Sequence, residues 1–193
     1  LQKSLVVVRS PYTVGSGIII GYENGKTKIL TSKQIVEKVS NVSEVTVLAN
    51  EDQLPAVAIF FAPDNLSLAF VYIQGIHGSP ASLNYDTLPG EAILSLSYDV
   101  LSQGTITGTT ETTTSTGYEY TIIETDIDLG NGGGIFSDDA LIGVITSNST
   151  DLIVISTIVL QSNSTWPSFD PDPPVGPDIP IPCDLSDPEC VAC

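Results

Sequence analysis

Residues 130–134 read Gly-Asn-Gly-Gly-Gly and stand between an acidic turn at 126–128 and an apolar stretch, Leu-Ile-Gly-Val-Ile, at 141–145. Glycines let the backbone adopt positive φ and approach another segment or a ligand closely. A tight turn is the ordinary explanation of such a cluster. The fold prediction depends on which segments surround the cluster and in what order they occur.

The composition favours an all-β protein. Of the 193 residues, 41% are hydrophobic, and 16 glycines and 13 prolines separate short apolar runs. A chain of this length can bury a sizeable core in one domain or in two lobes. β-branched residues are frequent and no segment shows helical periodicity, so we expect short strands joined by turns.

The first half of the chain predicts six strands. Asn24-Gly25 is a strong hairpin signal between two of them. Six strands are enough for a small barrel, so residues 1–74 are predicted to form an N-terminal β-barrel lobe. The strands are expected near 5–8, 15–21, 27–31, 44–49, 54–61 and 67–73.

The second half repeats this pattern after a connection at 75–90 that is rich in glycine and proline. Residues 91–160 are predicted to form a C-terminal β-barrel lobe. The threonine-rich run at 109–116 is expected as an exposed hairpin tip, which could carry O-linked glycans. The strands are expected near 91–97, 103–109, 118–124, 134–136, 141–147 and 151–159.

The composition changes after Leu160. Residues 167–193 hold eight prolines, six acidic residues and all three cysteines. Because proline lacks the N–H that a ladder needs, residues 161–193 are predicted to form an extended tail, with polyproline II character from Pro171 to Pro182. Trp166 and Phe169 are predicted to anchor this tail to the domain or to a neighbouring subunit. A disordered acidic tail is the alternative.

The cysteines Cys183, Cys190 and Cys193 are odd in number. In a secreted chain this leaves one thiol for a bridge to another chain, and the sequence does not fix whether the others pair within or between chains. We expect no metal and no cofactor, because zinc ligands are too few and the single histidine, His77, is distant in sequence.

The charges are unevenly placed. All six basic residues lie in residues 1–38 with only two acids, which gives that segment +4 although the net charge is −17. Nucleic acid and anionic membranes are therefore poor partners. Solubility through net charge is one explanation. The other is a dipolar subunit whose basic start meets the acidic end of a neighbour.

The start of the chain and its sequons favour secretion. The sequence begins at Leu1 without Met, which suggests that a leader has been removed. No apolar run approaches the ~20 residues of a spanning helix. N-linked glycosylation is predicted at four sequons, those of Asn41, Asn65, Asn148 and Asn163.

Four segments, in this order, resemble the chymotrypsin-like serine proteases, most closely their HtrA branch. The resemblance covers residues 5–160 and implies two six-stranded antiparallel β-barrels. Its segments are Gly-Ser-Gly-Ile-Ile-Ile at 15–20, Leu-Thr-Ser-Lys-Gln-Ile-Val at 30–36, Leu-Ser-Leu-Ala-Phe-Val at 66–71, and residues 124–134 with the apolar stretch that follows them.

The family's catalytic triad is not matched. At the places that the resemblance implies for histidine, aspartate and serine, this chain has Gln34, Ser67 and Gly132. Glutamine cannot take a proton from a nucleophile near neutral pH, and glycine offers no nucleophilic atom. The sequence therefore predicts a catalytically dead pseudoprotease that is not an enzyme.

We expect this pseudoprotease to be a secreted, self-assembling extracellular subunit of a filament or surface layer, with its tail contacting a neighbour head to tail. The alternative is a binding module that captures a peptide in the cleft near Gln34, Ser67 and Gly132, or regulates an active protease. An active hydrolase that uses other residues is a third possibility.

Overall fold

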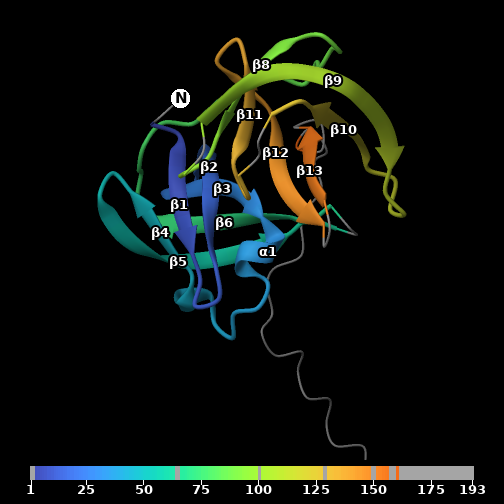
Figure 1. Ribbon diagram of the computed structural model, residues 1–193. Coiled ribbons are helices and arrows are strands. Elements are labelled where there is room, and N and C mark those ends of the chain that lie inside the picture. Colours follow the sequence, from blue (N-terminus) through green and yellow to red (C-terminus); the bar gives the residue numbers. More distant parts are fainter. Residues whose placement is uncertain are drawn as a thin grey trace, which may run out of the picture.

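The computed structural model describes residues 3–63, 66–99, 101–127, 130–148, 151–156 and 160. These residues form two β structures that pack side by side, with a single short α-helix among them (Figure 1). Almost all the elements are antiparallel strands, which confirms the all-β class predicted from the sequence.

The first β structure is a closed antiparallel barrel in the order β1-β2-β3-β6-β5-β4. Its inward side chains alternate along each strand, and Ile29, Ile59 and Val71 are among those that fill its core. Its strands are β1 (Leu5–Arg9), β2 (Val14–Glu23), β3 (Lys26–Ser32), β4 (Thr46–Ala49), β5 (Asp52–Phe61) and β6 (Leu68–Gln74). Helix α1 (Lys33–Val36) and the 3-10 turn η1 (Val42–Glu44) lie between β3 and β4.

The second β structure is a seven-stranded sheet in the order β11-β8-β9-β10-β13-β12-β7. A further pairing of β11 with β12 closes six of these strands on themselves and leaves β7 at the edge. It departs from the expected six strands by β7, which pairs in parallel with β12 and comes from the predicted connection. The strands are β7 (Ser82–Leu83), β8 (Ala92–Leu96), β9 (Leu101–Thr113), β10 (Glu119–Thr125), β11 (Gly134–Ser137), β12 (Ala140–Asn148) and β13 (Asp151–Ser156).

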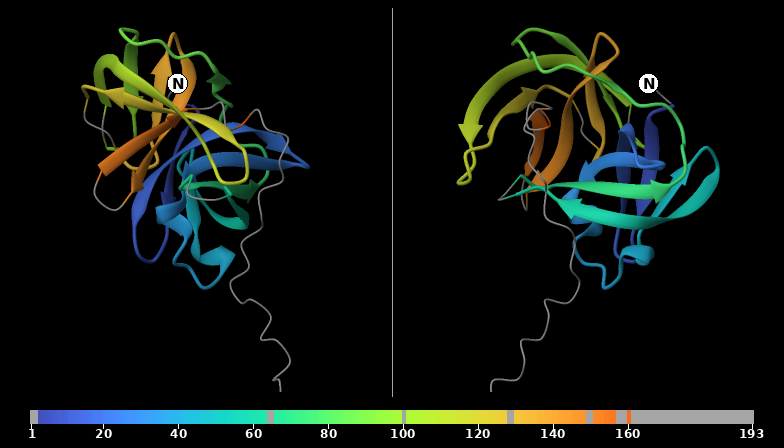
Figure 2. Two further views of the ribbon diagram at one scale, coloured as in Figure 1. Left: turned by 90° about the vertical axis from the view of Figure 1, so that its right-hand side faces the viewer. Right: turned by 180° about the vertical axis from the view of Figure 1, so that it is seen from behind.

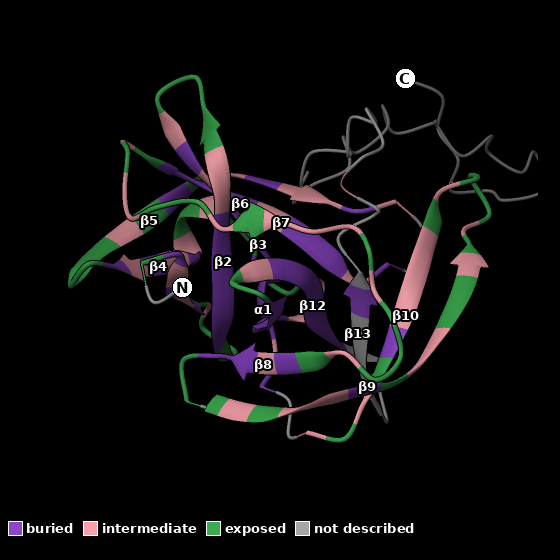
Figure 3. Cartoon of the chain, turned by 90° about the horizontal axis from the view of Figure 1, so that it is seen from above, coloured by how far each residue is buried: buried purple, intermediate pink, exposed green. Residues whose placement is uncertain are grey.

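A buried apolar cluster joins the two β structures. Along β3, Ile29 points into the first barrel whereas Leu30 packs against Phe136 and Val144 of the second sheet. Burying a side chain of this size contributes roughly 1.5–3 kcal/mol. Figure 3 shows that β2 and β12, which lie where the two β structures meet, are largely buried. Strands β9 and β10 are mostly half-buried or exposed.

Strand β9 is longer than expected and corrects one prediction. The threonine run at 109–116 was expected as a loop, but β9 continues through Thr113, so only the last part of the run is a turn. Thr has high strand propensity, and Thr109–Thr113 pair with β10. The ribbon of β9 and β10 curves over the second sheet and projects beyond it (Figures 1 and 2).

Among the described residues there is no helix long and apolar enough to cross a bilayer.

Candidate functional site

The glycine loop is held by its own backbone. The N–H of Gly132 donates to the carbonyl oxygen of Ile145 at 3.0 Å, and the N–H of Gly133 donates to that of Gly130 at 3.0 Å. The N–H of Ile145 donates to the carbonyl oxygen of Gly133 at 2.9 Å. Gly132 has φ +74°, a value that favours glycine. The loop is therefore a fixed turn against β12.

Ser16 of β2 ties this loop to the first barrel. Its N–H donates to the carbonyl oxygen of Asn131 at 3.1 Å, and its hydroxyl accepts from the N–H of Tyr98 at 2.7 Å. Its carbonyl oxygen accepts from the hydroxyl of Thr31 at 2.6 Å. Ser16 and Thr31 are both fully buried, so these bonds lie away from water. The sequence had marked Ser16 only as part of a strand.

Gly132 fits closely against the first barrel. A Cβ atom built on it would overlap the carbonyl oxygen of Ser16 and lie 2.8 Å from Cδ1 of Ile35 and 3.0 Å from Oγ1 of Thr31. Distances below 3.0 Å require a neighbour to shift. With this backbone, a side chain at position 132 has no room.

Helix α1 carries Gln34 to the same place. The helix follows β3 directly, and its buried residues Ile35 and Val36 fix its orientation. The N–H of Lys33 donates to the carbonyl oxygen of Ser67 at 2.8 Å, and Ser67 has φ +53°. The structure thus brings together the segments of Gln34, Ser67 and Gly132, which are far apart in sequence.

A cavity of about 350 Å³ opens beside these residues. Its lining includes Gln34 and Asn131, and it is bordered by the β1–β2 turn and the end of α1 through Tyr12, Thr13, Glu37 and Lys38. The side-chain oxygen of Asn131 is buried and has no hydrogen-bond partner among the described residues. Sequence reasoning missed this lining, because no motif marks it.

The cleft offers hydrogen-bonding groups of both kinds. The amide of Gln34 both donates and accepts, while Glu37 and Lys38 contribute one charge of each sign. The N–H of Gly132 is bonded to the carbonyl oxygen of Ile145 and is not offered to the cleft. Such an arrangement suits an extended peptide, whose backbone carries alternating donors and acceptors.

His77 lies elsewhere. Its N–H donates to the hydroxyl of Thr27 at 2.9 Å, and Nε2 lies 2.9 Å from the carbonyl oxygen of Gln74. Lys26 pairs with Gln74 at one end of the β3–β6 ladder, whereas Ser32 pairs with Leu68 at the other. A strand of seven residues spans about 20 Å, so the only histidine of the chain is far from Gln34.

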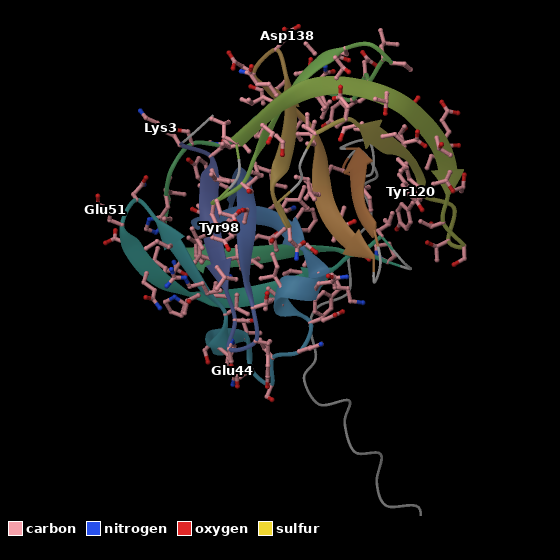
Figure 4. All side chains as sticks on the ribbon, in the orientation of Figure 1. Lys3, Glu44, Glu51, Tyr98, Tyr120 and Asp138 are labelled. Atoms are coloured by element: carbon pink, nitrogen blue, oxygen red, sulfur yellow. The ribbon has the colours of Figure 1, made fainter. Side chains whose placement is uncertain are left out.

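A larger cavity of about 540 Å³ lies on the second sheet, lined by residues that include Ile93, Gln103, Phe136 and Asp138. It is remote in the fold from Gln34. Figure 4 shows Asp138 at the β11–β12 turn, on the opposite side of the second sheet from the first barrel. Within the described ranges, no group of three or more His, Cys, Asp or Glu side chains is arranged to hold a metal ion.

Of the four predicted glycosylation sites, the structure describes the side chain of one. Asn41 is exposed, and its side-chain oxygen accepts from the N–H and the hydroxyl of Ser43, both at 2.9 Å. Asn148 ends β12. The remaining predicted sites lie outside the described residues: Asn65, Asn163, Trp166, Phe169, Cys183, Cys190 and Cys193.

No family model and no curated protein matches the sequence. Solved structures do match. An inactive form of a mutant of Rv3671c from M. tuberculosis has a TM-score of 0.63 at 16% identity over 82% of this chain and 83% of that one. The inactive form of the Rv3671c protease has a TM-score of 0.62 at 18% identity, covering 82% and 85%. Kallikrein-related peptidase 10 has a TM-score of 0.56 at 12% sequence identity, over 82% of this chain and 91% of that one.

These comparisons correct one prediction. The expectation that the chain is not an enzyme is contradicted, because the solved structures that share its fold are serine proteases. At 12–18% identity the likeness shows the fold alone. It assigns no catalytic residue to this chain.

Proposed function

We propose that this chain is a secreted, N-glycosylated subunit that assembles outside the cell into a filament or surface layer, with its C-terminal segment contacting a neighbouring copy. The fold serves as the rigid body of that subunit. Kinship with the HtrA branch is part of the proposal and is supported by the motifs at 15–20 and 124–134.

The distribution of charge carries the proposal. Every Lys and Arg lies between Lys3 and Lys38, in the part of the chain that forms β1, β2, β3 and α1, whereas residues 39–193 carry acids and no base. Residues 1–74, which include the first barrel, hold six bases and six acids, whereas residues 75–193 hold 17 acids and no Lys or Arg. The basic residues of 1–38 and the acidic second sheet and tail give each molecule two unlike parts. Unlike parts that attract form head-to-tail contacts, which extend into open assemblies when they do not close into a ring.

Sedimentation of the full chain over a range of concentrations tests the assembly. The expected result is species larger than a monomer whose share grows with concentration and falls as salt screens the charges. Electron microscopy of the same samples should show filaments or sheets. A chain that sediments as a monomer at high concentration, with and without reductant, contradicts the proposal.

The glycosylation part has its own test. Asn41 lies on the exposed surface at the start of η1. Expressed through a secretory pathway, the protein should carry a glycan that Asn41→Gln removes, seen as a mass difference. The exposed Asn50, which is not in a sequon, is the matched control.

A second candidate function is peptide binding in the cleft at Gln34. The 350 Å³ cavity and the buried, unbonded side-chain oxygen of Asn131 favour it. Fluorescently labelled peptides should bind, and Gln34→Ala or Lys38→Glu should weaken binding at least tenfold while His77→Ala leaves it unchanged. The same samples should be assayed for peptide cleavage, which would show that a bound peptide is also turned over.

A further inference from the structure

The outer side of β3, β6 and β5 carries an unusual surface. Ile29, Ile59 and Val71 point into the barrel core, so their neighbours along each strand point outward. Toward one end of these strands the outward side chains include the basic Lys26 and Lys28 of β3 and the aromatic Phe60, Phe70 and Tyr72 of β5 and β6, whereas the outward Leu30 and Leu68 are buried in the cluster between the two β structures. We call Lys26, Lys28, Phe60, Phe70 and Tyr72 the aromatic-lysine face; Phe60 and Phe70 are half-buried and Tyr72 is 8% exposed.

These side chains form a connected group. The Lys28 ammonium lies 4.2 Å from the ring centre of Phe70 and 5.7 Å from that of Tyr72. Phe60 meets Tyr72 edge to face, with ring centres 5.5 Å apart. The Tyr72 hydroxyl donates to Glu23 at 2.9 Å, and Lys28 lies 3.7 Å from the same carboxylate. The rings are therefore held in place before any partner arrives.

The face has a small depression. A cavity of about 140 Å³ lies between Lys26, Ala58, Phe60 and Tyr72 and is bordered by Glu23 and Asn24. An aromatic wall with a small cavity suits the ring of a proline, as in domains that bind polyproline II segments between aromatic side chains. Lys26 at its edge, and Lys28 elsewhere on the same face, suit a segment that also carries carboxylates.

The last described residue packs against the same buried cluster as two residues of this face. Phe60 and Phe70 pack at the edge of the buried cluster between the two β structures, and Leu160 packs against the same cluster. The 33 residues after Leu160 include six acids, no base, and prolines at 167, 171, 173, 174, 177, 180, 182 and 188. Their composition complements the face in charge and in side-chain type.

We infer that the aromatic-lysine face is the acceptor for residues 161–182 of a neighbouring copy, with prolines of that segment against Phe60, Phe70 and Tyr72 and its carboxylates beside Lys26 and Lys28. The inference rests on the proposed self-assembly and names its contact. A polyproline II segment of 12 residues would extend about 37 Å. A segment that extended in this way would turn back poorly onto its own domain, which favours a second copy over the same chain.

Two full-length variants test the inference. The acceptor variant, Lys26→Glu with Lys28→Glu, reverses the charge of the face. The donor variant, Trp166→Ala with Asp170→Asn and Asp172→Asn, alters the segment. Each should self-associate at least tenfold more weakly than the wild type in sedimentation. Lys3→Glu with Arg9→Glu makes the same charge change away from the face, before and at the end of β1, and should weaken self-association clearly less than the acceptor variant does.

Mixing gives the decisive measurement. The acceptor variant keeps its segment and the donor variant keeps its face, so an equimolar mixture should form one-to-one dimers although each variant alone is monomeric. A mixture that stays monomeric overturns the inference, because it places the segment on its own chain. Lys28→Gln, a milder change, should weaken association in the same direction if the double variant folds poorly.

The outcomes also separate this inference from the proposed function. If the acceptor variant assembles as well as the wild type, the face is not the acceptor although the assembly exists. If the wild type itself does not assemble, the proposed function fails first, and the inference fails with it.

Discussion

The N–H of Ser16 donates a 3.1 Å hydrogen bond to the carbonyl oxygen of Asn131 and so ties β2 of the first barrel to the glycine loop beside β12. The same serine accepts a bond from Thr31 through its carbonyl oxygen. Three segments thus meet at one buried residue. The position of the loop, and of the cleft at Gln34, depends on this junction.

Gly132→Ala should destabilise the protein more than Gly25→Ala. Both glycines have φ near +73°, but a Cβ at Gly132 overlaps Ser16, whereas nothing lies within 4 Å of a Cβ at Gly25. Backbone strain alone should cost about 1 kcal/mol at Gly25, and strain with overpacking about 3 kcal/mol at Gly132. Urea unfolding measures both, and equal losses would contradict the close fit.

Thr31→Val should cost about 1–3 kcal/mol, because the carbonyl oxygen of Ser16 loses a buried donor. The shape of the side chain is nearly kept, so packing changes little. Thr46→Val on β4, where the hydroxyl only accepts an exposed 3.4 Å bond from Gln53, is the control. Its free energy of unfolding should stay within about 0.5 kcal/mol of the wild type.

Leu30→Ala should cost about 2–5 kcal/mol in unfolding free energy, since it opens a cavity in the cluster between the two β structures. Leu101→Ala, at a side chain that is 68% exposed, should change it by less than about 0.5 kcal/mol. A loss at Leu30 no larger than that at Leu101 would mean that the two β structures do not depend on each other.

Tyr72 should make stability fall in alkaline solution. Burial, together with the hydrogen bond to Glu23 and the charge of that carboxylate, raises the pKa of the Tyr72 phenol well above 10.0. Above pH 10 the unfolded state therefore releases a proton that the folded state keeps. The stability present below pH 10 should decline as pH rises, and Tyr72→Phe should remove part of this decline in urea titrations. Tyr12→Phe, at a 63% exposed ring, should not.

Asp126 should contribute to stability only above acidic pH. Its carboxylate accepts from the N–H of Thr105 at 2.7 Å and from the Thr105 hydroxyl at 3.1 Å, and the backbone bond is the main reason that the pKa of Asp126 is lowered. The difference in unfolding free energy between wild type and Asp126→Ala should be present above about pH 4 and shrink as pH falls through the lowered pKa. A difference that is constant with pH would contradict this.

Most strands could be predicted because each depends on local pattern. The hairpin at Asn24-Gly25 and the short apolar runs of β3 and β6 are signals of a few residues. The extent of β9 could not be predicted in this way. Its threonines read equally as loop or strand, and pairing with β10 decided between them.

The candidate site was only half predictable. The resemblance to proteases located Gln34, Ser67 and Gly132, and the structure brings their segments together. The roles of Ser16 and Tyr98 depend on contact between residues 82 apart in sequence, which no local pattern signals. Whether the chain is an enzyme was predicted wrongly, because missing triad residues were given more weight than the fold.

The first barrel can close before the rest of the chain has been synthesised. All six of its strands lie within residues 5–74, so they can pair while the ribosome is still adding the second half. The outward Leu30 and Leu68 stay uncovered during that interval, until β11 and β12 arrive to bury them. The nascent chain therefore carries an apolar surface that is open to chaperones, and the bond between Ser16 and Asn131 closes only after the glycine loop has been synthesised.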